Sequence, residues 1–97
     1  MGAPESARSL LRASTHGVLA TLGLDPVGGF PFTSAVPYCL DADGMPLLLI
    51  SRLARHTSHA SADNRVSLFV QESLPGKDIQ ASPRLCLSGH LLPVPDS

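Results

Sequence analysis

The sequence lacks an excess of charge of either sign. Lys and Arg number 7 against 8 Asp and Glu, which gives a formal net charge of −1 at pH 7 over 97 residues. Proteins that bind nucleic acid displace counterions from phosphates with clustered Lys and Arg, and no such cluster is present. Nucleic acid is therefore not an expected partner. The charged fraction of 15% is also too low for a disordered, self-repelling chain, so we expect a folded one.

Long apolar runs are missing as well. The run from Pro46 to Ile50 falls far short of the roughly 20 residues that a membrane-spanning helix needs. The N-terminus lacks the basic, apolar and small-residue pattern of a secretory signal. Cysteine is scarce, and both Cys39 and Cys86 lie in apolar, strand-like segments, where buried free thiols are common and a disulfide is not needed. These absences predict a cytoplasmic protein without a membrane anchor.

The chain length allows one modest hydrophobic core. Domains of about this size bury only about two-thirds of the surface that the unfolded chain exposes. We therefore expect residues 1–97 to form a single domain. A small β-rich chain leaves strand edges in water, and association with a second subunit would cover them. The sequence thus favours a homodimer.

Residue patterns predict a short helix followed by strands. The segment from Glu5 to Ala13 places its apolar side chains on one side and Arg8 and Arg12 on the other, as in an amphipathic helix. Runs rich in β-forming residues then alternate with turn residues. The expected strands are His16 to Leu24, Phe30 to Leu40, Leu47 to Ile50, Arg65 to Gln71 and Arg84 to Leu92.

Three further features complete this map. The Asp43–Gly44 pair favours a tight hairpin turn after the second strand, because it tolerates positive φ angles. The segment from Leu53 to Asp63 mixes small apolar and polar residues in a way that is typical of a second helix. Gly89 is the expected site of a bulge in the last strand.

Four stretches occur in a familiar order. They are HGVLATL (His16 to Leu22), PFTSAVPY (Pro31 to Tyr38), LLLISRLARHT (Leu47 to Thr57) and PRLCLSG (Pro83 to Gly89). Together they resemble the split barrels of the pyridoxamine 5′-phosphate oxidase family, which bind flavin mononucleotide (FMN). The likeness is strongest to a branch with haem-degrading, heme-oxygenase-like members, and it covers about Ala7 to Val94. That branch has a signature similar to Ser51 to Thr57, followed by Asp63 and Arg65 to Leu68.

The resemblance implies a mainly β fold with flanking helices, namely a split β-barrel. His59 stands where the family more often has Asn, and Asn64 where it more often has Pro. The family domain usually continues through a further strand and helix after the stretch that ends at Gly89. The barrel is therefore expected to be incomplete and its flavin pocket open on one side.

The resemblance also implies an FMN site. The phosphate would lie where the third strand meets the second helix, because unpaired N–H groups and the helix dipole favour an anion there, and Arg55 can grip phosphate oxygens in bidentate fashion. The phosphate-site residues would be Ser51, Arg52, Arg55, His56 and Thr57. Ser34, Val36, Pro37 and Tyr38 would line the isoalloxazine ring, and Arg84 matches a position that reaches the polar edge of the ring.

Each of these residues also has an ordinary structural interpretation. Arginines on an exposed helix face are commonly solvated, and the resemblance alone turns the preference for Arg52 and Arg55 towards ligand binding. Val36 and Tyr38 are strand residues that can equally pack in the core. Arg84 can equally pair with a loop carboxylate such as Asp78.

A metal site is a competing interpretation. His56 and His59 lie three residues apart on the predicted helix and can face the same side. Two histidines leave the coordination shell incomplete, however, and neither a CxxC nor an HExxH spacing is present, so no metal site is expected. A nucleophile elbow, a Walker loop and a catalytic carboxylate pair are absent too. Catalytic side chains therefore cannot be assigned.

These patterns lead to one functional expectation and two alternatives. The expectation is an FMN-binding protein, a flavin-dependent oxidoreductase of unassigned substrate, in which the cofactor does the redox chemistry and lies between two subunits. The first alternative is a non-enzymatic dimeric module that holds flavin or haem, or that has lost its cofactor and serves as an interaction unit. The second is a haem-handling role, suggested by the nearest branch, for which no residue stands out as an axial ligand.

Overall fold

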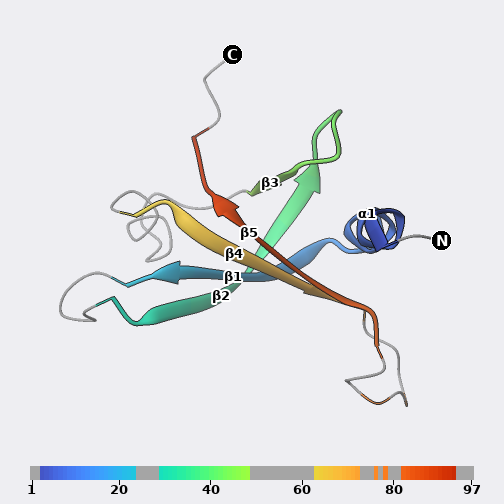
Figure 1. Ribbon diagram of the computed structural model, residues 1–97, viewed down its shortest axis with the longest axis horizontal. Coiled ribbons are helices and arrows are strands. Elements are labelled where there is room, and N and C mark those ends of the chain that lie inside the picture. Colours follow the sequence, from blue (N-terminus) through green and yellow to red (C-terminus); the bar gives the residue numbers. More distant parts are fainter. Residues whose placement is uncertain are drawn as a thin grey trace.

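A curled antiparallel sheet with one helix beside it makes up the described part of the chain. The computed structural model describes residues 3–23, 29–48, 63–72, 76, 78 and 82–93. Its elements are α1 (Ala3–Ala13), β1 (His16–Leu22), β2 (Pro31–Leu40), β3 (Pro46–Leu48), β4 (Arg65–Gln71) and β5 (Arg84–His90). The strands form one sheet in the order β3-β2-β1-β4-β5 (Figure 1). The predicted mainly β architecture is confirmed, as a five-stranded half-barrel.

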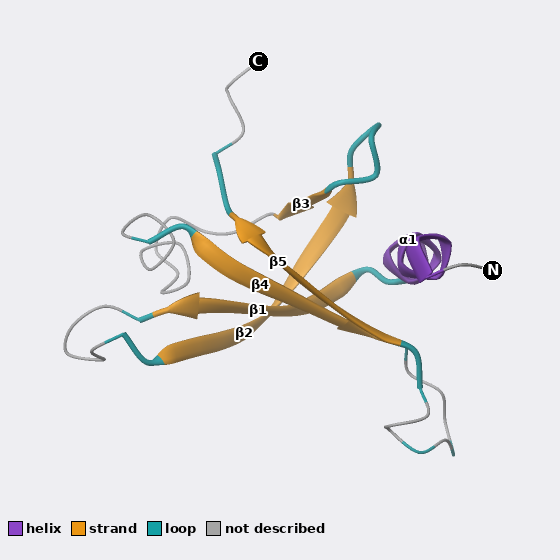
Figure 2. Cartoon of the chain, in the orientation of Figure 1, coloured by secondary structure: helices purple, strands orange, loops and turns teal. Residues whose placement is uncertain are grey.

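The sheet buries one of its faces because apolar and polar residues alternate along the strands. We call the buried side the inner face and the other side the outer face. Leu10 and Leu11 of α1 pack on the inner face, so the helix covers one end of the sheet (Figure 2). The buried core consists of these two leucines with Leu19, Val36, Tyr38, Leu68 and Val70.

The predicted element bounds agree with the structure for β4 and are close for the others. The helix begins at Ala3 rather than Glu5, and β1 ends at Leu22 rather than Leu24. β2 begins one residue later than predicted, and β5 ends at His90 rather than Leu92. Residues 53–62 of the predicted second helix lie outside the described residues. No helix in the described part of the chain is long and apolar enough to cross a membrane.

The turn between β2 and β3 forms at the predicted place. Gly44 has a φ of 83°, and its N–H donates to the carbonyl oxygen of Asp41 at 3.0 Å. The carboxylate of Asp41 accepts two further backbone N–H groups, from Asp43 and Met45, each at 2.9 Å. A residue with a side chain would be strained at Gly44, so the Asp-Gly pair determines this turn.

Two sequence predictions about β2 and β5 were wrong. Gly89 is not a bulge, because it pairs with Val66 in an unbroken one-to-one register between β4 and β5. The free thiols of Cys39 and Cys86 are exposed rather than buried. They lie on the outer face, opposite Leu47 and Phe69 in the sheet register, while their chain neighbours take the inner positions.

At Gly17, β4 lies too close to β1 to leave room for a side chain. A Cβ atom at this position would lie 2.7 Å from the backbone oxygen of Phe69 and 3.1 Å from side-chain atoms of Leu68 and Val70. The backbone oxygen cannot move without disturbing the pairing of β1 with β4. A side chain at Gly17 would therefore force these two strands apart.

We expect Gly17→Ala to lower the free energy of unfolding by about 1–3 kcal/mol, as overpacking in a dense core does. Urea unfolding followed by circular dichroism measures this loss. Gly89→Ala is the matched control, because a Cβ at Gly89 meets no atom within 4 Å, and its effect should stay within about 0.5 kcal/mol. Equal effects of the two substitutions would contradict the proposed close contact.

Candidate functional site

The sheet opens into a fork where β1 and β4 separate. These strands pair only from Val18 to Ala20, opposite Ser67 to Phe69. Beyond Ala20, β1 stays paired with β2 as far as Leu22, while β4 stays paired with β5 at its own first residue, Arg65. The β1–β2 ribbon and the β4–β5 ribbon therefore diverge towards the left of Figure 1.

A cavity of about 510 Å³ lies in this fork. Small-molecule sites commonly have volumes of about 300–1,000 Å³, so the space is suited to a ligand of cofactor size. We call it the fork cavity. It is lined by Ala20, Thr21, Leu22 and Pro31 from the first ribbon and by Arg65, Val66, Ser67, Ser88, Gly89 and His90 from the second.

The two ribbons give the cavity two kinds of wall. The first ribbon contributes mainly apolar side chains, such as Leu22 and Pro31, whereas the second contributes a guanidinium, an imidazole and two hydroxyl groups. The hydroxyl oxygens of Ser67 and Ser88 lie 2.7 Å apart and share a hydrogen bond across β4 and β5. An amphipathic ligand can therefore place its apolar part against one ribbon and its polar part against the other.

Arg65, which lines the cavity at the start of β4, forms an ion pair with Asp63. Arg65 donates from Nε to Oδ1 of Asp63 at 3.0 Å and from Nη2 to Oδ2 at 2.6 Å, which is a bidentate arrangement. The Asp63 carboxylate also accepts the backbone N–H of Arg65 at 3.1 Å. These hydrogen bonds from Arg65 lower the pKa of Asp63 to about 2, so both partners are charged at neutral pH.

The end of the second ribbon holds Arg65 and His90 next to each other. The two residues are direct partners in the β4–β5 register. One step beyond them, the N–H of Leu91 donates to the carbonyl oxygen of Asn64 at 2.8 Å, which extends the pairing past the last strand residue. Both side chains belong to the outer face, where they line the fork cavity.

The predicted phosphate site belongs to a segment that the structure does not describe. Ser51, Arg52, Arg55, His56 and Thr57 all lie outside the described residues, as does His59. Their role as a phosphate cradle therefore stays a prediction. Within the described residues, no group of three or more His, Cys, Asp or Glu side chains is placed to hold a metal ion.

The predicted ring-lining residues of β2 divide between the two faces of the sheet. Ser34, Val36 and Tyr38 belong to the inner face and Pro37 to the outer face, as strand alternation requires. Val36 is 2% exposed and Tyr38 8% exposed, so both side chains are core residues. The structure thus brings together the side chains of Val36 and Tyr38 in the core but does not bring Pro37 to them.

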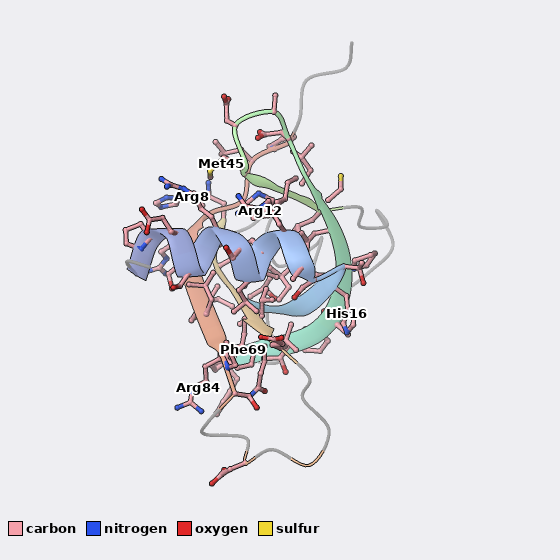
Figure 3. All side chains as sticks on the ribbon, turned by 90° about the vertical axis from the view of Figure 1, so that its right-hand side faces the viewer. Arg8, Arg12, His16, Met45, Phe69 and Arg84 are labelled. Atoms are coloured by element: carbon pink, nitrogen blue, oxygen red, sulfur yellow. The ribbon has the colours of Figure 1, made fainter. Side chains whose placement is uncertain are left out.

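Arg84 lies far from the fork cavity. It pairs with Gln71 at the start of β5, whereas the cavity is at the other end of that strand, beside His90. Figure 3 shows its side chain projecting outwards at the lower left of the molecule. Contact between Arg84 and the edge of a flavin ring stays a prediction.

Tyr38 joins the helix to the sheet. Its hydroxyl donates to the carbonyl oxygen of Leu11 at 2.8 Å, and its backbone N–H donates to Thr15 at 3.0 Å. The Leu11 carbonyl is in the last turn of α1, where carbonyl groups have no partner within the helix. Burial raises the pKa of Tyr38 and outweighs the opposite effect of its hydrogen bond with Ser14.

Sequence reasoning had not assigned a role to the residues of the fork cavity. Asp63 and Arg65 to Leu68 were recognised only as part of a family signature, and His90 was given no role. The signature was the available signal, since it joins an acidic and a basic residue at the start of a strand. Arg65 and His90 are neighbours because β4 pairs with β5, and the sequence of either strand alone does not reveal that pairing.

Comparisons with known proteins agree on the fold. The family model described as "CREG, beta-barrel" matches residues 1–97. The curated protein "Non-canonical heme oxygenase HOZ, chloroplastic" of Arabidopsis thaliana is 38% identical over 66 residues, which are 68% of this chain and 20% of that protein. The chain thus spans about a fifth of the length of that relative.

Two solved structures extend this comparison. The heme binding protein from Mycobacterium smegmatis superposes with a TM-score of 0.83 at 33% identity, covering 93% of this chain and 36% of that one. HutZ, the heme storage protein from Vibrio cholerae, superposes with a TM-score of 0.75 at 25% identity, covering 98% of this chain and 65% of that one. The likeness to haem-related proteins that the sequence motifs implied is therefore confirmed.

We expect Tyr38→Phe to lower the free energy of unfolding by about 1–2 kcal/mol, because the buried Leu11 carbonyl loses its partner. Since the folded state raises the pKa of Tyr38 above its ordinary value of 10.0, the wild type should lose stability as the pH rises past that value. Urea unfolding at neutral pH and above pH 10.0 measures both effects.

The substitution removes the only tyrosine of the chain, so any remaining pH dependence in this range belongs to other groups. The Tyr38→Phe variant should lose less stability at alkaline pH than the wild type does. Identical alkaline slopes for the two proteins would show that the Tyr38 hydroxyl is not held neutral by the folded state.

Proposed function

The chain belongs to the CREG β-barrel family, and from that premise we propose that it is a haem-binding domain that works as a homodimer. The fork cavity is the observation that carries this proposal, because it combines apolar side chains with an imidazole and a guanidinium. Relatives that are named for haem binding, storage and oxygenation support the choice of ligand.

The donor set of the cavity fits the chemistry of haem. Haem presents a flat apolar macrocycle, an iron atom that accepts an axial nitrogen ligand, and two acidic propionate groups. His90 would ligate the iron, and Arg65 would pair with a propionate. Leu22, Pro31 and Val66 would contact the macrocycle. When bound, haem would supply redox chemistry, and these residues would bind and orient it.

The outer face of the sheet supports the homodimer. α1 packs on the inner face, so no helix of the described part covers the outer one. Its central residues are small or apolar, with Ala35 and Pro37 exposed and Val18 39% exposed. Arg65 and Arg84 lie at its margins, at the ends of β4 and β5. A surface with this distribution is typical of subunit contacts, and the fork cavity opens beside it.

Haem titration followed by absorbance tests the proposed function. We expect saturable binding by the wild type and an affinity about tenfold lower for Arg65→Gln, because a charge-assisted hydrogen bond is lost. His90→Ala should alter the absorption spectrum of the bound haem, since the iron would lose the imidazole nitrogen that His90 would supply. Sedimentation velocity on the same samples reports whether the loaded species is a dimer.

Arg84→Gln is the matched control for Arg65→Gln. It removes the same charge from the opposite end of the β4–β5 ribbon, away from the fork cavity. Its haem affinity should equal that of the wild type. Absence of saturable haem binding, or equal losses for the two arginine variants, would contradict the proposal.

FMN binding is the second candidate, with a flavin-dependent oxidoreductase as the corresponding enzyme. The donor set of the segment from Ser51 to Thr57 favours it, because two arginines, two hydroxyl groups and an imidazole suit a phosphate. The segment lies outside the described residues, so this candidate depends on the sequence and on the family resemblance.

FMN titration at low salt tests this second candidate. Arg55→Ala should lower the affinity for FMN about tenfold, because a phosphate loses a charged partner, whereas Arg65→Gln should leave it unchanged. Equal FMN affinity of the wild type and Arg55→Ala would remove Arg55 from the phosphate site. A chain that binds neither FMN nor haem would be an interaction unit.

A further inference from the structure

We propose that Asp63 is a specificity-determining residue of the fork cavity, because its carboxylate competes with the acidic group of a ligand for Arg65. This inference rests on the proposed function, which makes Arg65 the anchor for a propionate. Removal of the Arg65 charge should weaken the binding of an acidic ligand, whereas removal of the Asp63 charge should tighten it.

The geometry of the ion pair is that of a bound carboxylate. The Nε and Nη2 atoms of Arg65 donate to the two oxygens of Asp63 at 3.0 and 2.6 Å. This two-bond arrangement is the one by which a guanidinium recognises carboxylate groups of ligands. Asp63 therefore already occupies the Nε–Nη2 edge of Arg65, one of the edges by which a guanidinium can hold a carboxylate.

Asp63 is held in this position by the chain itself. Its Oδ1 atom accepts the backbone N–H of Arg65 at 3.1 Å, two residues further along. The contact is local, so it does not depend on any other element. A ligand must either displace this carboxylate or bind the remaining N–H groups of Arg65 next to a negative charge. Both routes reduce its affinity.

The exposure of the pair shows that displacement is possible. The Arg65 side chain is 68% exposed and that of Asp63 is 34% exposed. Ion pairs with such access to water contribute little to stability and are screened by salt. The competition should therefore lower ligand affinity by a moderate factor and should weaken as the salt concentration rises.

The charge of the ligand follows from this arrangement. The Asp63 carboxylate compensates the Arg65 guanidinium, so the pair is neutral as a whole. A neutral ligand would gain nothing from the loss of Asp63. A ligand with a free carboxylate would gain the full guanidinium charge. Asp63 thus sets how strongly the cavity distinguishes acidic ligands from neutral ones of the same shape.

The test compares haem with haem dimethyl ester, in which both propionates are esterified. Each is titrated against the wild type, Asp63→Asn, Arg65→Gln and the double variant, at low and high salt. Asn keeps an acceptor for the Arg65 backbone N–H but carries no charge. Thermal unfolding of each variant verifies that it is folded. Glu72→Gln removes an equal charge from an exposed position at the other end of β4.

At low salt, we expect Asp63→Asn to bind haem on the order of fivefold more tightly than the wild type, because the Nε and Nη2 donors of Arg65 lose a competing carboxylate. The gain should be absent for the dimethyl ester, in the Arg65→Gln background, at high salt and in Glu72→Gln. The double-variant cycle compares the effect of Asp63→Asn on haem affinity in the presence and absence of Arg65. It therefore measures how far Asp63 acts on the ligand through Arg65.

Unchanged or weaker haem binding by folded Asp63→Asn would overturn the inference, since Asp63 would then only orient Arg65. An equal gain for the ester, or in the Arg65→Gln background, would overturn it as well. If Arg65→Gln binds haem less tightly than the wild type in the same experiment, the proposed function stands although the inference about Asp63 fails. Failure of the wild type to bind haem would contradict the proposed function itself.

Discussion

The short pairing between β1 and β4 is the constraint on which the described structure depends. It joins the two antiparallel ribbons over Val18 to Ala20 only, and the backbone of Phe69 approaches Gly17 so closely that a Cβ would not fit. On one side of this contact the ribbons share a core with α1. On the other side they separate, because each strand keeps its partner in its own ribbon, and the fork cavity is the result.

The side chains on the inner face of the sheet form the hydrophobic core and stabilise the fold. Leu19, Val36, Leu68 and Val70 exclude water there, and Tyr38 uses its hydroxyl to satisfy a carbonyl of α1. A side chain that is buried and already hydrogen-bonded is not available to a ligand without loss of stability. The side chains that are available to bind a ligand consequently lie at the ends and on the outer face of the sheet, where the second ribbon presents its polar residues.

Charge in this nearly neutral protein is arranged locally. The cavity contains a guanidinium whose charge is compensated by its own chain neighbour, beside an imidazole and a pair of linked hydroxyl groups. Apolar side chains from the first ribbon complete the space. Such a site suits an amphipathic ligand better than a simple anion. This balance agrees with the similarity of the chain to haem-related proteins.

The sequence by itself determined the local structure, since strand alternation, the Asp43–Gly44 turn and the amphipathic helix depend on neighbours along the chain. It predicted β4 from Arg65 to Gln71 to the residue, and its motifs identified the split-barrel likeness. Only the tertiary structure decided that β4 lies beside β1, that Cys39 and Cys86 face outwards, and that Arg65 meets His90. Those placements depend on register between distant segments, and register is determined by side-chain packing across the whole sheet rather than by the pattern of any single strand.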